Sequence, residues 1–305
     1  MKTTPSCVLM VRPHCFSLNP ETLADNSFQV GAGSADSDAA FSEATALART
    51  LEEAGVEVLL FEDLGVETPD SVFPNNWLSA HPDGTLVTYP MRATSRRRER
   101  RADILAALER RFAVTRRIDL ASHETEGRSL EGTGAIVFDH PRRRAFAARS
   151  GRCDEGLLRD LCAALDYAPT IFTATCADGR PVYHTNVMMA LGSGYALVGL
   201  DLVRDRDERA ALQAALGGRE IIPLEPCQVD DFAGNAFELA GRAGPCLLLS
   251  TRAAAALRPD QRSAIEQHAR LIPVAVPTIE RAGGSVRCML AAVELPPRPV
   301  VSVAT

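Results

Sequence analysis

Five polar residues recur along the chain at nearly constant spacing, and three of them are of types that carry out covalent catalysis. They are Asn76, Glu131, His184, Asn235 and Cys288, and the successive steps between them are 55, 53, 51 and 53 residues. A fixed period of this length is typical of a repeat architecture, in which equivalent positions occupy equivalent places. We therefore expect the five side chains to converge on one site.

A thiol, an imidazole and a carboxylate together are the groups needed for nucleophilic catalysis through a thiolate. Cys288 would attack a carbon, His184 would move protons to the leaving amine and later from water, and Glu131 would orient a substrate nitrogen. Each residue alone has a simpler interpretation. A cysteine is often just a small buried hydrophobe, and Asn76 and Asn235 are also typical turn residues. The shared period favours the catalytic interpretation.

The segments that follow four of these residues share one pattern, a hairpin followed by a helix and a strand. In the clearest example, strands 76–80 and 85–89 flank a Pro-Asp-Gly turn, with a helix over 96–111 and a strand over 113–118. The other three units are predicted at hairpin 134–149, helix 154–165 and strand 169–173; hairpin 182–202, helix 205–216 and strand 220–224; and hairpin 235–250, helix 259–269 and strand 271–276.

The two ends of the chain supply a fifth unit. A strand over 7–12, a helix over 38–54 with Gly55 as its C-cap, and a strand over 56–61 are predicted near the N-terminus. One further strand is predicted over 286–295. Pairing the terminal strands would close a ring and leave no open end. The pattern thus predicts an α/β fold, a pseudo-fivefold ring of hairpin-helix-strand units that forms a single catalytic domain over residues 1–305.

Composition sets limits on the class of protein and its partners. The 305 residues are 46% hydrophobic and 24% charged, as in an ordinary globular protein, and the net charge of -6 implies no nucleic-acid partner. No run reaches membrane-spanning length and no signal peptide is recognised, so a cytoplasmic location is expected. The eight cysteines form no CxxC pair, so we expect free thiols and no zinc site. The oligomeric state is not determined by the sequence, and a homo-oligomer is compatible with it.

Five segments, in order along nearly the whole chain, resemble the guanidino-group-modifying enzymes of the pentein superfamily. They are FPNNW (73–77), LEGTG (130–134), YHTN (183–186), GNAFEL (234–239) and GSVRC (284–288). The resemblance is strongest to citrulline-utilisation hydrolases, and it implies a five-bladed α/β-propeller with a Cys/His/Glu site. It further implies Cys288 as nucleophile, His184 as acid/base and Glu131 as the carboxylate on the substrate side. Thiolate and imidazole can carry both half-reactions, so no metal or organic cofactor is expected.

Two departures from that resemblance bear on the substrate. Arginine-acting members commonly carry aspartate where this chain has Asn76, and arginine deiminases have His-x-Asp where this chain has His184-Thr-Asn186. Paired carboxylates suit a cationic guanidinium. An asparagine offers both an N–H donor and a C=O acceptor, as the neutral ureido group of citrulline requires. We therefore hypothesise that L-citrulline is hydrolysed to ornithine, ammonia and carbon dioxide through a carbamoyl-type intermediate on Cys288, with Asn76, Asn186 and Asn235 binding the substrate.

The substrate's α-carboxylate requires a cation. Arg97 and Arg152 resemble family arginines with this role, because a guanidinium binds a carboxylate through two hydrogen bonds. The run from 96 to 101 is equally typical of a solvated helix start. Arg287 fits either the site or a structural pair.

Other functions remain open. The same three catalytic residues would serve a dimethylarginine hydrolase, an arginine deiminase or an amidinotransferase. A non-catalytic propeller that binds an amino acid or a partner protein is a different class, which the intact thiol, imidazole and carboxylate set disfavours. In the catalytic cases the partner is a small ureido or guanidino amino acid.

Overall fold

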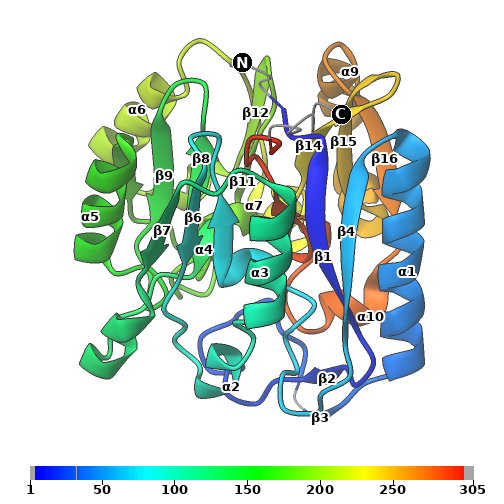
Figure 1. Ribbon diagram of the computed structural model, residues 1–305. Coiled ribbons are helices and arrows are strands. Elements are labelled where there is room, and N and C mark those ends of the chain that lie inside the picture. Colours follow the sequence, from blue (N-terminus) through cyan, green and yellow to red (C-terminus); the bar gives the residue numbers. More distant parts are fainter. Residues whose placement is uncertain (1–3, 32, 299–305) are drawn as a thin grey trace, which may run out of the picture.

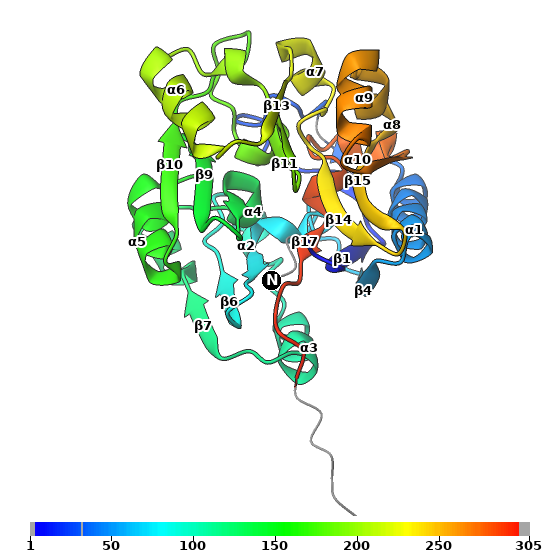
Figure 2. The same cartoon turned by 90° about the horizontal axis from the view of Figure 1, so that it is seen from above.

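Five small three-stranded sheets of the same make-up follow one another around a ring, seen from the side in Figure 1 and from above in Figure 2. The computed structural model describes residues 4–31 and 33–298. In each sheet the first two strands are antiparallel and the third is parallel to the second. Parallel neighbours need a crossover connection, and here a segment containing a helix provides it. The protein therefore has a mixed α/β fold.

The strands of the five sheets are β17 (Ala291–Ala292), β1 (Cys7–Pro13) and β4 (Glu57–Asp63); β5 (Leu78–Ala80), β6 (Thr85–Thr88) and β7 (Arg116–Asp119); β8 (Val137–Asp139), β9 (Arg144–Ala148) and β10 (Ala168–Phe172); β11 (Met189–Leu191), β12 (Tyr195–Val198) and β13 (Glu220–Pro223); and β14 (Phe237–Gly241), β15 (Gly244–Ser250) and β16 (Arg270–Val274). A separate two-stranded sheet pairs β2 (Ser17–Leu18) with β3 (Gly33–Ser34). The order of strands in the four predicted internal units is thereby confirmed.

The longer helices lie on the outside of the ring (Figure 2). They are α1 (Ser37–Ala54), α3 (Ala102–Arg111), α5 (Glu155–Leu165), α6 (Arg206–Ala215) and α9 (Pro259–Glu266). The side chain of Asp36 caps the start of α1, and Gly55 caps its end in the left-handed region, as predicted. The apolar face of α1, including Leu47 and Leu51, packs in the same core cluster as Met10 of β1. No helix in the described part of the chain is long and apolar enough to cross a membrane.

Contacts between neighbouring sheets close the ring. β17 contacts β5, β8 contacts β11, and β11 contacts β14, while the short helix α4 (Gly132–Ala135) touches both β5 and β8. The last gap is bridged by backbone hydrogen bonds from Ala240 N to Pro5 O at 2.8 Å and from Arg242 N to Ala54 O at 2.7 Å. The predicted pairing of the terminal strands is also confirmed, because β1 runs antiparallel to β17.

Short helical turns precede the first strands of several sheets, and here the sequence-based expectation was wrong. The predicted strand over 286–295 is instead the 3₁₀ turn η5 (Val286–Met289) followed by the two residues of β17. The turns η1 (Pro74–Asn76) and η3 (Thr185–Val187) occupy the equivalent places before β5 and β11. A short apolar run cannot be assigned to strand or turn by periodicity alone. These turns matter because they carry the candidate site residues.

The remaining short elements connect these units. They are α2 (Thr94–Arg97), α7 (Pro226–Asp230), α8 (Thr251–Ala256), α10 (Pro277–Glu280), η2 (Ala121–Glu126) and η4 (Leu200–Leu202). The predicted single helix over 96–111 is therefore two helices, α2 and α3, separated by residues 98–101.

Candidate active site

The turns η1, η3 and η5 and the start of α4 meet at one end of the ring and bring the predicted polar residues together. Asn76 ends η1, Glu131 precedes α4, His184 precedes η3, and Cys288 lies within η5. All four are buried. They lie at or beside a pocket lined by Thr22, Asn26, Asp70, Phe73, Asn76, Arg96, Arg152, Tyr183, His184, Ala282, Gly283, Gly284 and Cys288. Residues far apart in sequence thus converge, as the repeat period predicted.

Two carboxamides hold the thiol of Cys288. Asn235 Nδ2 lies 3.2 Å and Asn186 Nδ2 3.4 Å from Cys288 Sγ, so both can donate to the sulfur. The Asn235 side chain is itself fixed, because its Oδ1 accepts from Arg287 N at 3.1 Å and its Nδ2 donates to Asn186 O at 2.9 Å. Two N–H donors aimed at sulfur stabilise negative charge there. The sulfur of Cys288 is therefore held in a fixed position by two polar side chains.

Glu131 lies behind His184 and orients its ring. His184 Nε2 is 2.8 Å from Glu131 Oε2. Burial would raise the pKa of the Glu131 carboxyl, but Arg152, His184 and Arg96 outweigh it and hold that pKa well below its ordinary range. An ionised Glu131 accepts the Nε2 proton of a neutral imidazole and leaves Nδ1 as an acceptor. His184 is therefore set to take up a proton during a reaction.

The titration of His184 should make the stability of the fold depend on pH. Burial lowers the pKa of His184 to about 4, although Glu131 opposes the shift. An unfolded histidine binds its proton below about pH 6.5, so on acidification the unfolded state takes up the proton first. Between pH 7 and pH 5 this group should remove about 2 kcal/mol from the free energy of unfolding. Urea unfolding measures this loss. Between pH 7 and pH 5 the free energy of unfolding of the His184→Gln variant should fall by about 2 kcal/mol less than that of the wild type. If the two proteins lost the same free energy over this interval, His184 would not be the group responsible.

The absence of a side chain at Gly134 lets His184 and Asn76 approach each other. A Cβ atom at this position would lie 2.7 Å from His184 Nδ1 and 2.9 Å from Asn76 Nδ2, closer than real contacts allow. Gly134→Ala should therefore displace both side chains and lower kcat/KM roughly 10- to 100-fold, because small misplacements in an active site are costly. Gly156→Ala is the matched control, since its Cβ would meet only the flexible end of Arg128 and the Asp154 side chain. Equal turnover by the two variants would contradict this account.

Arg96, and not Arg97, is the buried arginine of the α2 segment. Arg96 lines the pocket and lies near Glu99, Asp70 and Glu131, at 2.9, 3.7 and 3.7 Å. Arg97 is about one-third exposed and turns away, donating to Met91 O at 3.1 Å. Successive residues of a helix point about 100° apart, so only one of the two can face the pocket. The prediction that named Arg97 is corrected to Arg96.

Arg152, the other predicted arginine, does line the pocket, but its guanidinium already has partners. Its Nη2 lies 2.5 Å from Asp25 Oδ1 and its Nη1 3.4 Å from Glu131 Oε2, and its plane lies over the ring of Tyr183. Asp25 belongs to the loop over residues 19–31. A substrate carboxylate that reaches Arg152 must therefore compete with a carboxylate supplied by the protein itself.

The same loop closes the pocket. Its Asn26 Nδ2 donates to Ala282 O at 3.3 Å, and Val30 N donates to Arg281 O at 2.8 Å. The space left inside is about 10 Å³, enough for about one water molecule. This space is too small for an amino-acid substrate, so residues that line the pocket must move before one binds.

Several pocket residues were not found from the sequence. Asp70 lies in an irregular segment with no periodic signal, and Asp25 and Asn26 lie in a loop whose position depends on tertiary contacts. Tyr183 could have been found from the sequence, because it adjoins the predicted site residue His184. In the structure its hydroxyl donates to Gly283 O. Among residues 4–31 and 33–298, no group of three or more His, Cys, Asp or Glu side chains could hold a metal ion.

Solved structures of similar fold come from enzymes of arginine chemistry. The N-terminal domain of ArgZ, an arginine dihydrolase from the ornithine-ammonia cycle in cyanobacteria, was determined covalently bound to a reaction intermediate; it superposes with a TM-score of 0.77 at 18% identity, covering 95% of this chain and 98% of that one. A dimethylarginine dimethylaminohydrolase in adduct with S-methyl-L-thiocitrulline superposes with a TM-score of 0.68 at 15% identity, covering 94% of this chain and 99% of that one. At these identities the likeness concerns the fold.

AgrE, solved as a ternary complex with ornithine and NAD⁺, is also similar, with a TM-score of 0.77 at 18% identity over 96% of this chain. The chain spans only 40% of AgrE and 41% of the longer ArgZ protein. No curated protein sequence matches the chain. The family of eukaryotic N,N dimethylarginine dimethylhydrolases matches residues 12–295, which is most of the sequence. The chain therefore belongs to this family and, with it, to the guanidino-group-modifying pentein superfamily.

Proposed function

We propose that the protein is a cysteine-dependent hydrolase of L-citrulline, built on a five-bladed α/β-propeller formed by the five sheets. The observation that carries the proposal is the set of carboxamides at the thiol. Asn186 and Asn235 contact Cys288 Sγ, and no carboxylate among the described residues does so. Asn76 lines the same pocket, and its buried Oδ1 has no hydrogen-bond partner. A ureido N–H group would supply that missing donor.

In the first half-reaction, Cys288 Sγ attacks the ureido carbon. The bond from that carbon to the ornithine nitrogen breaks, and the proton of the thiol reaches the leaving nitrogen through His184. Ornithine leaves, and a carbamoyl group stays on the sulfur. The carboxamide donors Asn186 and Asn235 stabilise the thiolate before attack. Glu131 keeps the imidazole in the tautomer whose Nδ1 accepts a proton.

In the second half-reaction, water attacks the S-carbamoyl carbon. His184 takes a proton from the water and returns it to the departing sulfur, so the free thiol is regenerated. The product is carbamic acid, which decomposes to ammonia and carbon dioxide. No change of oxidation state occurs, and no group beyond thiol, imidazole and water is required.

We assign the α-carboxylate to Arg152 or Arg96, the two arginines that line the pocket. Arg152 is the better candidate, because its present partner Asp25 sits on the loop that must open for entry. Displacing Asp25 frees two N–H groups for a bidentate contact with the carboxylate. Arg96 has a firmer partner in Glu99, which lies only three residues away.

A second candidate is a dimethylarginine hydrolase, the activity for which the matched family is named. Asp70 favours it, because this carboxylate lines the pocket and could pair with a cationic guanidinium. Burial raises the pKa of Asp70, with Arg96 and Asn19 opposing the shift. Asp70 therefore favours this candidate in its ionised form, because only a carboxylate pairs with a cation.

Parallel assays with purified protein distinguish these candidates. We expect ornithine and ammonia from L-citrulline, and a kcat/KM for L-arginine and N,N-dimethylarginine at least about 100-fold lower, because a site built for hydrogen bonding rejects a mismatched substrate by such factors. Amino-acid analysis measures ornithine and citrulline directly. Release of dimethylamine and citrulline from dimethylarginine would instead establish a dimethylarginine hydrolase and refute the citrulline hydrolase.

A further inference from the structure

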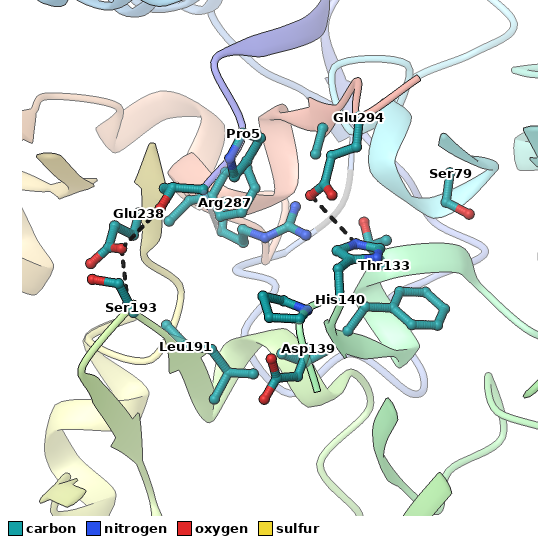
Figure 3. Close-up of a pocket in the computed structure, with 18 of the residues that line it drawn as sticks. Pro5, Ser79, Thr133, Asp139, His140, Leu191, Ser193, Glu238, Arg287 and Glu294 are labelled. Atoms are coloured by element: carbon teal, nitrogen blue, oxygen red, sulfur yellow. Dashed lines mark hydrogen bonds and ion pairs between the residues drawn. The ribbon is translucent and has the colours of Figure 1, made fainter. Parts of the chain in front are cut away.

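A second cavity lies at the opposite end of the ring, among the turns of the hairpins and the N-terminal segment. Its volume is about 290 Å³, and Pro5, Ser79, Leu191 and Glu294 are among the residues that line it (Figure 3). The loop and α2 that border the first pocket lie at the other end of the molecule (Figure 1). None of the reacting groups of the candidate active site lines this cavity. The cavity is therefore separate from the candidate active site.

The cavity is joined to the active site by one short turn. Arg287 and Cys288 are consecutive residues of η5, yet Arg287 lines the second cavity and Cys288 lines the first. The two side chains thus point to opposite sides of the same backbone segment.

Each carboxylate of the cavity has at least one partner in the protein, although the buried Oε2 atom of Glu238 has none. Asp139 receives two hydrogen bonds from Arg219, at 2.6 and 3.0 Å. Glu294 lies 3.4 Å from His140 Nε2, and Glu238 accepts from Ser193 N at 2.9 Å (Figure 3). These groups are therefore held in place by the protein.

Arg287 differs from them. Its Nη1 donates to Leu290 O at 2.8 Å, and its guanidinium lies 4.1 Å from the centre of the Phe237 ring. None of the described carboxylates lies within 4.0 Å of it. Desolvation lowers the pKa of Arg287 to about 10, so the charge remains at neutral pH. Glu294 is the carboxylate of the cavity whose charge acts on Arg287, but at more than 4.0 Å it accepts from none of the five N–H donors of the guanidinium.

We propose that this cavity is a binding site for a small planar oxyanion, a carboxylate or bicarbonate, held by the fork of Arg287. The planar guanidinium matches two oxygens of such an anion through parallel hydrogen bonds. Phe237 and Leu191 supply apolar walls of the same cavity. Glu294 lines the same cavity and opposes an anion when it is ionised; burial raises the pKa of this carboxyl to about 7, although the charge of Arg287 opposes the shift.

Calorimetric titration of the full chain with sodium acetate, and separately with sodium bicarbonate, tests the proposal at fixed ionic strength. We expect saturable binding of one or both anions and none of the tetrahedral anion phosphate. Acetate alone would identify a carboxylate site, and bicarbonate alone a bicarbonate site. Arg287→Lys keeps the charge but loses the fork, and it should weaken binding at least about tenfold. Arg142→Lys makes the same change at the half-exposed rim and should leave binding unaltered.

Two further variants establish where on the protein the anion binds. Glu294→Gln should tighten anion binding several-fold, because it removes a competing negative charge. This measurement tests the proposal even if the Arg287→Lys variant does not fold. Arg152→Met reports on the active-site pocket and should leave anion binding unchanged. The proposal is overturned when neither anion binds, when Arg287→Lys binds as the wild type does, when Glu294→Gln has no effect, or when Arg152→Met abolishes the binding.

Discussion

The Cys288→Ala variant should fold normally and lose at least about 10³-fold in kcat on whichever substrate the wild type hydrolyses. The expected effect is large because Cys288 has the only side chain of the pocket that can form a thioester-like bond with the substrate carbon. The neighbouring carboxamides cannot replace it, since an amide nitrogen is not nucleophilic. Initial rates of ornithine or citrulline formation measure the loss.

A matched control separates chemistry from packing. Cys162→Ala makes the same substitution at a fully buried thiol of α5, in a core cluster that contains no pocket residue. That variant should lose about 1 kcal/mol or more in stability and keep its kcat. Substrate should also leave a carbamoyl adduct on Cys288 that mass spectrometry of rapidly quenched protein detects. Turnover by Cys288→Ala within tenfold of the wild type would remove Cys288 from the mechanism.

The repeating units could be predicted from the sequence because their signals are local. The hairpin of β5 and β6 follows from a Pro-Asp-Gly turn between two apolar runs, and α1 follows from apolar spacing closed by Gly55. The pairing of β1 with β17 is not local. It was predictable only because the four internal units left a strand-helix-strand segment at the N-terminal end of the chain and one strand at the C-terminal end.

The turns that carry the site residues could not be predicted in the same way. The run from Val286 to Leu290 is apolar except for Arg287, and its turn η5 is fixed by contacts with distant segments, such as the hydrogen bond between Arg287 N and Asn235 Oδ1. The same reason explains the error over Arg97. Three consecutive arginines carry no signal for which one faces inward, and the break between α2 and α3 sets their phase.

Substrate preference should respond strongly to charge at the carboxamides. In the double variant Asn76→Asp, Asn186→Asp, the ratio of kcat/KM for L-arginine to that for L-citrulline should rise roughly 100-fold or more. Two carboxylates beside the thiol pair with a guanidinium, whereas they repel the carbonyl oxygen of a ureido group. Citrulline turnover should fall for a second reason: Asn186 Nδ2, a donor to Cys288 Sγ at 3.4 Å, would be replaced by an acceptor.

Asn75→Asp is the control that shows whether position or charge alone is responsible. Asn75 adjoins Asn76 and is fully buried, yet it does not line the pocket, and neither of its side-chain polar atoms has a partner. A carboxylate there should cost stability, because a buried charge without a cation is unfavourable, and it should leave the preference between arginine and citrulline unchanged. A ratio that shifts equally in Asn75→Asp and in the double variant would mean that general electrostatics of the pocket select the substrate. A ratio that shifts in neither would refute the carboxamide argument and leave the citrulline proposal without its main support.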